Sequence, residues 1–120
     1  MNKRTAKELL HIRDWLETAE RLTEKGRAAY DSDPLLQEAG DSLMMKIGEA
    51  ARRLEQTGQA SAEIRWRDAV ANRNWLIHQY DHIDRDITWA TLTSSLPAWG
   101  ELLAAHFEEA LATLAAEAPK

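Results

Sequence analysis

The sequence contains no cysteine, and only three of its 120 residues are proline and five are glycine. The lack of cysteine excludes a disulfide framework and a thiolate metal site, and it is compatible with a reducing cytoplasm. Few prolines and glycines, with 44% hydrophobic and 29% charged residues, are typical of a compact, mostly helical protein. We therefore expect one domain over residues 1–120, built around a single hydrophobic core.

Basic residues are outnumbered by acidic ones, and long apolar runs are missing. Fifteen Lys and Arg face 20 Asp and Glu, a formal net charge of −5, which argues against a broad basic surface for nucleic acid. Any RNA would bind locally, and the candidate cluster is Arg65, Arg67 and Arg73, with Arg85 beyond it. No run is long enough to cross a bilayer, and the charged start is unlike a signal peptide. We expect a cytoplasmic protein without membrane association.

Hydrophobic spacing predicts an all-α fold, an antiparallel bundle of four to five helices without strands. The expected helices run from about Ala6 to Gly26, from Asp33-Pro34 to about Thr57-Gly58, from Ser61 or Ala62 through Ile77, from Asp84 to Asp86 onward, and from Trp99 through Leu114. The first two should form an antiparallel pair. Pro97 is predicted to interrupt the fourth pattern, because proline cannot donate a backbone hydrogen bond within a helix.

The stretch with the most chemical potential is the octad R-N-W-L-I-H-Q-Y, which begins at Arg73. The arginine supplies a permanent cation for a phosphate, His78 can move a proton near neutral pH, and the Tyr80 hydroxyl can be modified. Arg73 interrupts an apolar stripe that contains Trp66 and Val70, so it should be paired, lie in a cleft or lie at a subunit interface. On an ideal helix Arg73 and His78 are separated by about 140°. Their convergence requires the helix to end near His78 or a second copy of the chain to contribute, and we favour the second copy.

A divalent metal site is a weaker alternative. Its ligands would be His78, Asp81, His82 and Asp84. No third nitrogen ligand lies in register, and this segment is expected to leave the helix, so we expect neither a metal nor a cofactor. His11 and His106 are expected at surface or rim positions.

A second motif, I-G-E-A-A-R-R-L, extends from Ile47 to Leu54. Together with Arg-x4-His-x-Tyr, met here by Arg73, His78 and Tyr80 with Asn74 directly after the arginine, it makes the chain resemble the HEPN superfamily. The similarity is to the HepT-like toxins of prokaryotic MNT/HepT toxin-antitoxin pairs. Length, helical pattern and helix order extend this resemblance over nearly the whole chain.

The resemblance implies a homodimeric HEPN-like bundle that places two motif copies in a shared cleft and acts as a metal-independent endoribonuclease on RNA. His78 would act as general base or acid, Arg73 would stabilise charge on the phosphorane, and Asn74 would hold a phosphate or orient His78. It further implies that a cognate MNT-type nucleotidyltransferase antitoxin neutralises the toxin by transferring AMP to Tyr80.

The sequence is also compatible with two other functions. The chain could be a non-catalytic HEPN module that presents nucleotide or substrate to a nucleotidyltransferase, a role that would not need His78. It could also be a purely structural helical interaction protein. Within the second motif we expect Gly48 to permit close helix packing, and we expect Glu49 to pair with an arginine of the site.

Overall fold

The computed structural model describes residues 1–57 and 82–117, and this part of the chain is helical without any strand. Its elements are α1 (Lys3–Thr23), α2 (Arg27–Ser32), α3 (Pro34–Thr57), α5 (Arg85–Ala90), the π-helical η2 (Thr91–Ser95) and α6 (Leu96–Glu117). The predicted all-α class is confirmed. The expected third helix, from Ser61 or Ala62 through Ile77, lies outside the described residues.

Helix α1 starts and stops earlier than the apolar spacing predicts. Its N-cap is Asn2, whose side chain accepts a 2.8 Å hydrogen bond from the backbone N–H of Thr5, so the helix begins at Lys3 rather than near Ala6. Gly26 has a φ of +90°, a conformation that favours glycine, and it begins the short helix α2. Helix α2 was not predicted, because six residues are too few to display a period.

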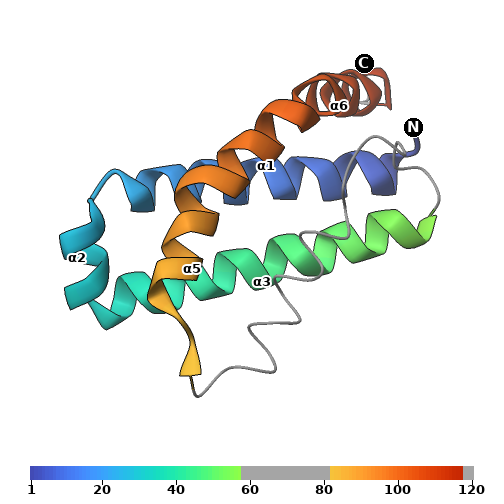
Figure 1. The fold of residues 1–120 in the computed structure, drawn as a ribbon. Coiled ribbons are helices and arrows are strands. Elements are labelled where there is room, and N and C mark those ends of the chain that lie inside the picture. The colour runs from blue at the N-terminus through green and yellow to red at the C-terminus, as the bar shows by residue number, and fades with distance from the viewer. Residues whose placement is uncertain (58–81, 118–120) are drawn as a thin grey trace.

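Helix α3 begins where the Asp33-Pro34 pair predicts. The Asp33 carboxylate accepts a 2.9 Å hydrogen bond from the backbone N–H of Leu35, while the ring of Pro34 suits a first helical position that needs no donor. The helix runs antiparallel to α1, as expected (Figure 1). Arg53 near the end of α3 binds Glu8 near the start of α1, and this ion pair joins the two helices at that end.

One hydrophobic core joins α1, α2, α3, η2 and α6. The largest fully buried side chains are Tyr30, Ile12, Ile47, Leu92, Leu103 and Thr88. Each buried leucine or isoleucine stabilises the fold by roughly 1.5–3 kcal/mol relative to an exposed one. The predicted apolar stripes therefore face the core in the three long helices, although Leu16 of α1, Leu36 of α3 and Leu114 of α6 are only half-buried.

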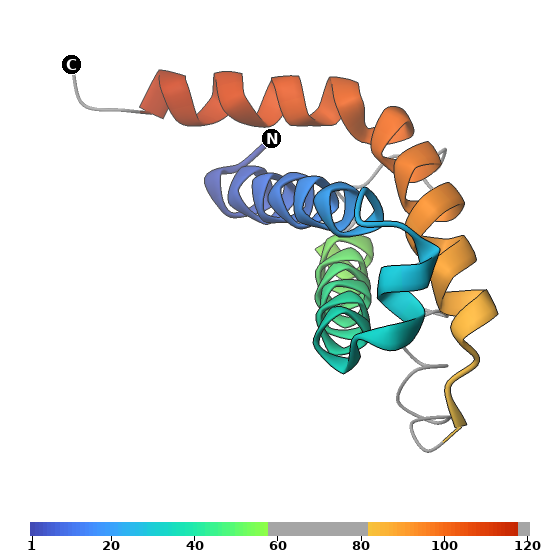
Figure 2. The same ribbon diagram turned by 90° about the vertical axis from the view of Figure 1, so that its left-hand side faces the viewer.

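The predicted break at Pro97 is wrong, because α5, η2 and α6 form one continuous bent arc that crosses α1 (Figures 1 and 2). Immediately before the proline the backbone is π-helical, and the N–H of Leu96 bonds to the carbonyl of Thr91, five residues back. This local widening changes the hydrogen-bond register where proline cannot donate, and the helix continues through it. In the described part of the chain, no helix is both long and apolar enough to span a bilayer.

Candidate functional site

The residues predicted to carry chemistry, Arg73, Asn74, His78 and Tyr80, lie outside the described residues, as do Arg65 and Arg67 of the expected basic cluster. The structure does describe both ends of the fold that flank them. Helix α3 ends at Thr57 on one side, and the chain enters α5 through Ile83 and Asp84 on the other. Ile83 packs against the core. The described residues nearest in sequence to the motif are therefore those at the end of α3 and at the start of α5.

Arg85, the first residue of α5, is bound to α3 by a two-pronged ion pair. Its two terminal nitrogens donate to the two carboxylate oxygens of Asp41 at 2.8 and 3.0 Å. The Arg85 side chain is 26% exposed and that of Asp41 15%, so both are substantially shielded from water. The hydrogen bonds that Arg85 donates to Asp41 are the main reason that the pKa of Arg85 is raised above its usual value. This guanidinium therefore stays charged across the physiological range.

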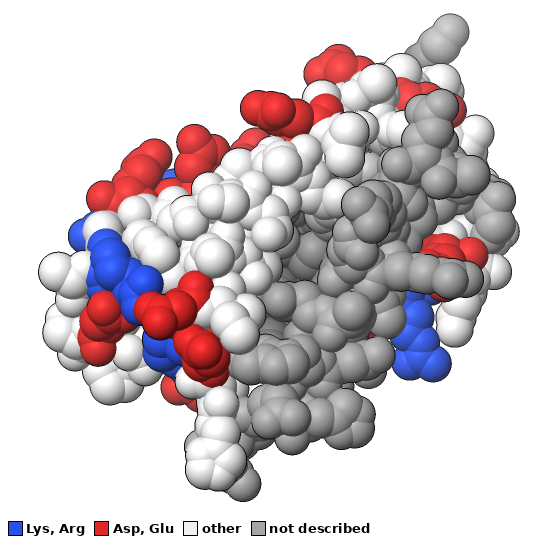
Figure 3. Space-filling model, viewed as in Figure 1, with Lys and Arg blue, Asp and Glu red and all other residues white. Residues whose placement is uncertain are grey.

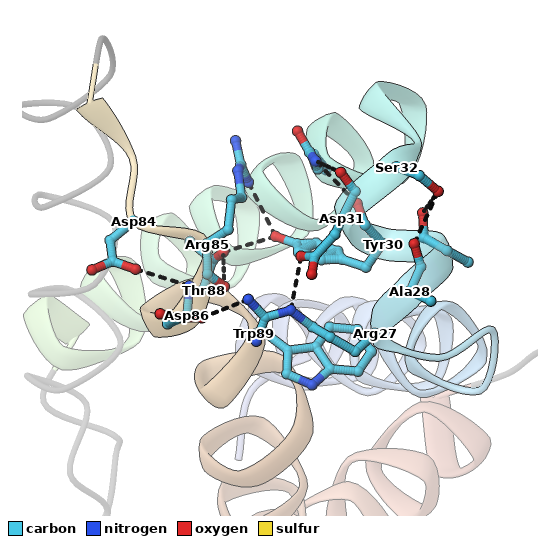
Figure 4. A network of polar contacts seen from close by, with 12 residues as sticks. Arg27, Ala28, Tyr30, Asp31, Ser32, Asp84, Arg85, Asp86, Thr88 and Trp89 are labelled. Carbon is cyan, nitrogen blue, oxygen red and sulfur yellow. Dashed lines mark hydrogen bonds and ion pairs between the residues drawn. The ribbon is translucent and has the colours of Figure 1, made fainter.

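Arg85 also contacts α2, through Tyr30 (Figure 4). It donates a 3.0 Å hydrogen bond to the Tyr30 hydroxyl, which in turn lies 2.8 Å from the Thr88 hydroxyl. The ring of Tyr30 is completely buried and packs against Trp89, with 5.1 Å between ring centroids. Three elements, α2, α3 and α5, consequently meet at one polar network of Tyr30, Asp41, Arg85 and Thr88.

A second, more exposed link joins α2 to α5. Arg27 donates to Asp31 on its own helix at 2.8 Å and to Asp86 on α5 (Figure 4). These hydrogen bonds raise the pKa of Arg27, and the one to Asp86 has the larger effect. Asp86 is 83% exposed, and an ion pair so open to solvent adds little stability. The half-buried Arg85 pair is therefore the stronger of these two polar links, and it anchors α5 to α3.

The anchor borders a groove of about 750 Å³ along α3. Its lining includes Trp15, Gln37, Asp41, Met45, Lys46 and Arg85. Trp15 contributes a half-buried ring that also contacts the exposed His11, with centroids 5.8 Å apart. The groove thus combines apolar and aromatic surface with charged groups directly beside the chain that leads into α5.

Charges along the groove are largely paired with each other. Arg53 binds Glu8, which raises the pKa of Arg53, and it lies 3.9 Å from Glu49. Glu49 thus meets an arginine, though one on its own helix, and its expected pairing with a motif arginine falls outside the described residues. Arg85 is held by Asp41 rather than presented to a ligand, which corrects its place in the expected basic cluster.

The comparisons with known proteins agree with this architecture. A model of the family described as "Ribonuclease HepT-like" matches residues 12–105, most of the chain. The chain belongs to this HepT-like ribonuclease family. No curated protein and no solved structure matches it significantly. The matched range contains both motifs and the Asp41–Arg85 anchor, so family membership supports a ribonuclease-type function for this fold.

Of the four residues considered as metal ligands in this HepT-like chain, the structure describes His82 and Asp84. Asp84 caps α5 by accepting hydrogen bonds from the backbone N–H groups of Asp86, at 2.9 Å, and Ile87. His82 is exposed, and over residues 1–57 and 82–117 no three potential ligands gather for a metal ion. His11 is exposed and His106 is half-buried, as the sequence predicts.

The polar network of Tyr30, Asp41, Arg85 and Thr88 was missed by sequence reasoning. Asp41 and Arg85 are separated by 44 positions and Tyr30 and Arg85 by 55, so no local spacing connects them. The available signal was Asp41 itself, a carboxylate beside the buried Gly40 and close to the apolar stripe of α3. A charge next to such a stripe needs a partner.

Proposed function

We propose that this chain is a metal-independent endoribonuclease toxin whose catalytic residues are Arg73 and His78. The supporting observation is the HepT-like ribonuclease family match, which spans the Arg-x4-His-x-Tyr motif. The octad brings together a phosphate-binding cation and a proton-transfer group within six residues. Neither group requires a metal for phosphodiester cleavage by the ribose hydroxyl.

The proposed reaction is an in-line attack of the RNA 2′-hydroxyl on the adjacent phosphorus. His78 removes the proton of the 2′-hydroxyl or delivers one to the departing 5′-oxygen, and Arg73 neutralises charge that develops on the phosphorane. Asn74 holds a phosphate oxygen or orients His78. The products are a 2′,3′-cyclic phosphate and a free 5′-hydroxyl. DNA lacks the attacking hydroxyl, so RNA is the expected substrate, most readily in exposed single-stranded regions.

The described anchor is consistent with a site next to the groove on α3. Ile83 packs against the core and Arg85 is bonded to Asp41 and Tyr30, so the chain is fixed immediately after the motif. Covalent connectivity keeps the Cα of Tyr80 within about 11 Å of that of Ile83.

The geometry of the motif favours a homodimer. Arg73 and His78 differ by about 140° on an ideal helix, so one copy alone does not readily aim both side chains at one phosphate. Two copies related by a two-fold axis can each supply one group to a shared cleft. The net charge of −5 agrees with RNA binding confined to such a local site.

We further propose that Tyr80 is the off-switch of this toxin. A cognate MNT-type nucleotidyltransferase would transfer AMP from ATP to the Tyr80 hydroxyl. The tyrosine oxygen would lose its proton and form a phosphodiester bond to the α-phosphorus of ATP, and pyrophosphate would leave. The added nucleotide places bulk and negative charge two residues from His78, where the RNA backbone must pass. Modified protein would therefore bind and cleave RNA poorly.

The test is cleavage of a fluorescent single-stranded RNA by the purified chain in the presence of EDTA. His78→Ala and Arg73→Ala are each expected to lower the rate by at least about 100-fold. His82→Ala is the matched control, because His82 is exposed and lies only four residues beyond His78. Equal rates for His78→Ala and wild type would overturn the nuclease assignment and leave the non-catalytic HEPN module as the explanation.

The off-switch has a separate experiment. Co-expression with a cognate MNT-type nucleotidyltransferase, followed by mass spectrometry, should show AMP-sized additions on Tyr80 that Tyr80→Phe abolishes. The modified wild type should lose RNA cleavage, whereas Tyr80→Phe should stay active in the presence of the partner. AMP on another residue, or none, would contradict this assignment without affecting the nuclease proposal.

A further inference from the structure

A second groove, separate from the one along α3, lies between the C-terminal half of α1 and the η2–α6 arc. It encloses about 730 Å³ and shares no described lining residue with the groove on α3. Its floor is apolar, formed by the half-buried Leu16 and Gly100 and by the edges of the core residues Leu92, Leu96 and Phe107. Figure 2 shows α6 above α1, with the arc of α5, η2 and α6 bending down beside α1.

The edges of this groove are acidic. Glu17, Glu20 and Glu24 follow one edge on α1, and Glu101 stands on α6. All four are exposed. Arg13 is the one cation among the described lining residues, and it is bonded to Asp14 at 3.3 Å. In Figure 3 acidic side chains follow the upper edge of the molecule, where Figure 1 shows α1 and α6.

Solvent-exposed apolar surface continues beyond the groove along α6. Ala104 lines the groove and is exposed, and Leu111, one turn after Phe107, is 41% exposed. A helix that keeps apolar groups on its outer face as well as its core face is typical of a helix that packs against another element. The apolar floor and the acidic edges together define the chemistry of that element.

We propose that this groove docks a cationic amphipathic helix of a partner protein. The apolar face of such a helix would cover the groove floor, and its Lys or Arg residues would meet the glutamates on the edges. The acidic positions on α1 are spaced i, i+3 and i+7, so the partner's cations should recur with the same helical spacing. Residues 13–24 of α1 extend over about 16 Å, which accommodates roughly three helical turns of the partner.

Charge decides between this occupant and others. The phosphates of RNA would be repelled by four glutamates, so this groove is unsuited to the substrate of the proposed nuclease. A second copy of the chain has basic residues at Lys3, Arg4 and Lys7, but these belong to α1, whose apolar face is already buried in its own core. Within the described residues, the chain thus offers no free helix of the required chemistry.

The test uses a fluorescein-labelled 18-residue model helix of Leu and Lys, with leucines on one face, and a matched peptide with Glu in place of every Lys. Fluorescence anisotropy should detect binding of the Lys peptide, weakening as salt rises, and no binding of the Glu peptide. The key comparison is Ala104→Trp against Ala105→Trp. Both alanines are exposed neighbours on α6, but only Ala104 lines the groove. Because neither is buried, both variants should fold.

Ala104→Trp should weaken peptide binding by about tenfold or more, whereas Ala105→Trp should leave it within about twofold. Glu20→Lys should also weaken binding, and Glu55→Lys, an exposed site on α3 outside the groove, should not. Equal affinities for the two tryptophan variants would overturn the proposal. A change in oligomeric state confined to Ala104→Trp, measured by light scattering, would instead identify the groove as an interface between copies and also refute it. RNA cleavage is scored separately and does not enter this test.

Discussion

Asp41→Asn is predicted to destabilise the protein through the ion pair with Arg85. The substitution keeps the size of the side chain and one acceptor oxygen, but it removes the charge that faces the guanidinium. Fully exposed ion pairs contribute up to about 1 kcal/mol, and breaking a buried pair costs about 3–5 kcal/mol. With side chains 15% and 26% exposed, this pair lies between the two limits. We expect the free energy of unfolding to fall by about 2 kcal/mol.

The assay is urea unfolding followed by circular dichroism, together with thermal melts. For 120 residues the entropy of unfolding implies a decrease of about 4 °C in Tm per kcal/mol, so Asp41→Asn should melt about 8 °C lower. Asp14→Asn is the matched control, because the pair of Asp14 with Arg13 is more exposed, at 60% and 33%. The control should change the unfolding free energy by no more than about 0.5 kcal/mol.

A double-mutant cycle separates the ion pair from other effects of each substitution. Asp41→Asn, Arg85→Gln and the double variant should give a coupling energy of at least about 1 kcal/mol. Arg85→Lys should not restore wild-type stability, because lysine cannot donate to both oxygens of Asp41 in a fixed fork. A coupling energy near zero, or equal decreases in the free energy of unfolding for Asp41→Asn and Asp14→Asn, would refute a stabilising role of the Asp41–Arg85 pair.

Three further predictions concern stability. Gly26→Ala should lower the free energy of unfolding by about 1 kcal/mol, because the φ of +90° at Gly26 is strained for alanine although no atom lies within 4 Å of the new Cβ. Gly100→Ala should instead raise the free energy of unfolding by up to about 1 kcal/mol, because the new Cβ on this helical residue would meet only Leu16 Cδ1, at 3.5 Å. Shifts of the urea midpoint in opposite directions for the two glycine variants would check both predictions. Tyr30→Phe should cost about 1 kcal/mol by depriving Arg85 and Thr88 of the buried hydroxyl, and a loss below the error of the urea fit would contradict this.

The fold follows from local signals wherever a cap or an apolar period dominates. Asp33-Pro34 correctly marks the start of α3, and Asp84 correctly marks the start of α5, because each cap acts on backbone groups two or three residues away. Helix α2 escaped prediction because it is shorter than two turns. The proline rule failed at Pro97 because it assumes an α-helical register, whereas the preceding backbone is π-helical.

The residues of the candidate site are also predictable only where they lie close together in the sequence. Arg-x4-His-x-Tyr is a contiguous pattern, so sequence alone nominates Arg73, His78 and Tyr80, and these assignments stay predictions. The anchor of Arg85 depends on Asp41 and Tyr30, which reach it only after α2 and α3 have packed. The sequence places Arg85 beyond a candidate basic cluster, and the structure corrects that interpretation by pairing its guanidinium with Asp41.

The two grooves allow the proposed activity and the proposed docking to vary independently. They lie on different faces of α1, since Trp15 lines the groove on α3 and Leu16 the acidic one, and neighbouring helical residues point about 100° apart. The acidic edge would repel RNA that approaches α6, whereas the described lining of the groove on α3 has equal numbers of acidic and basic side chains and adjoins the anchored entry to α5. A partner bound on the acidic side would therefore leave the RNA-cleaving side open. Control of cleavage would then fall to the motif itself, through the proposed modification of Tyr80.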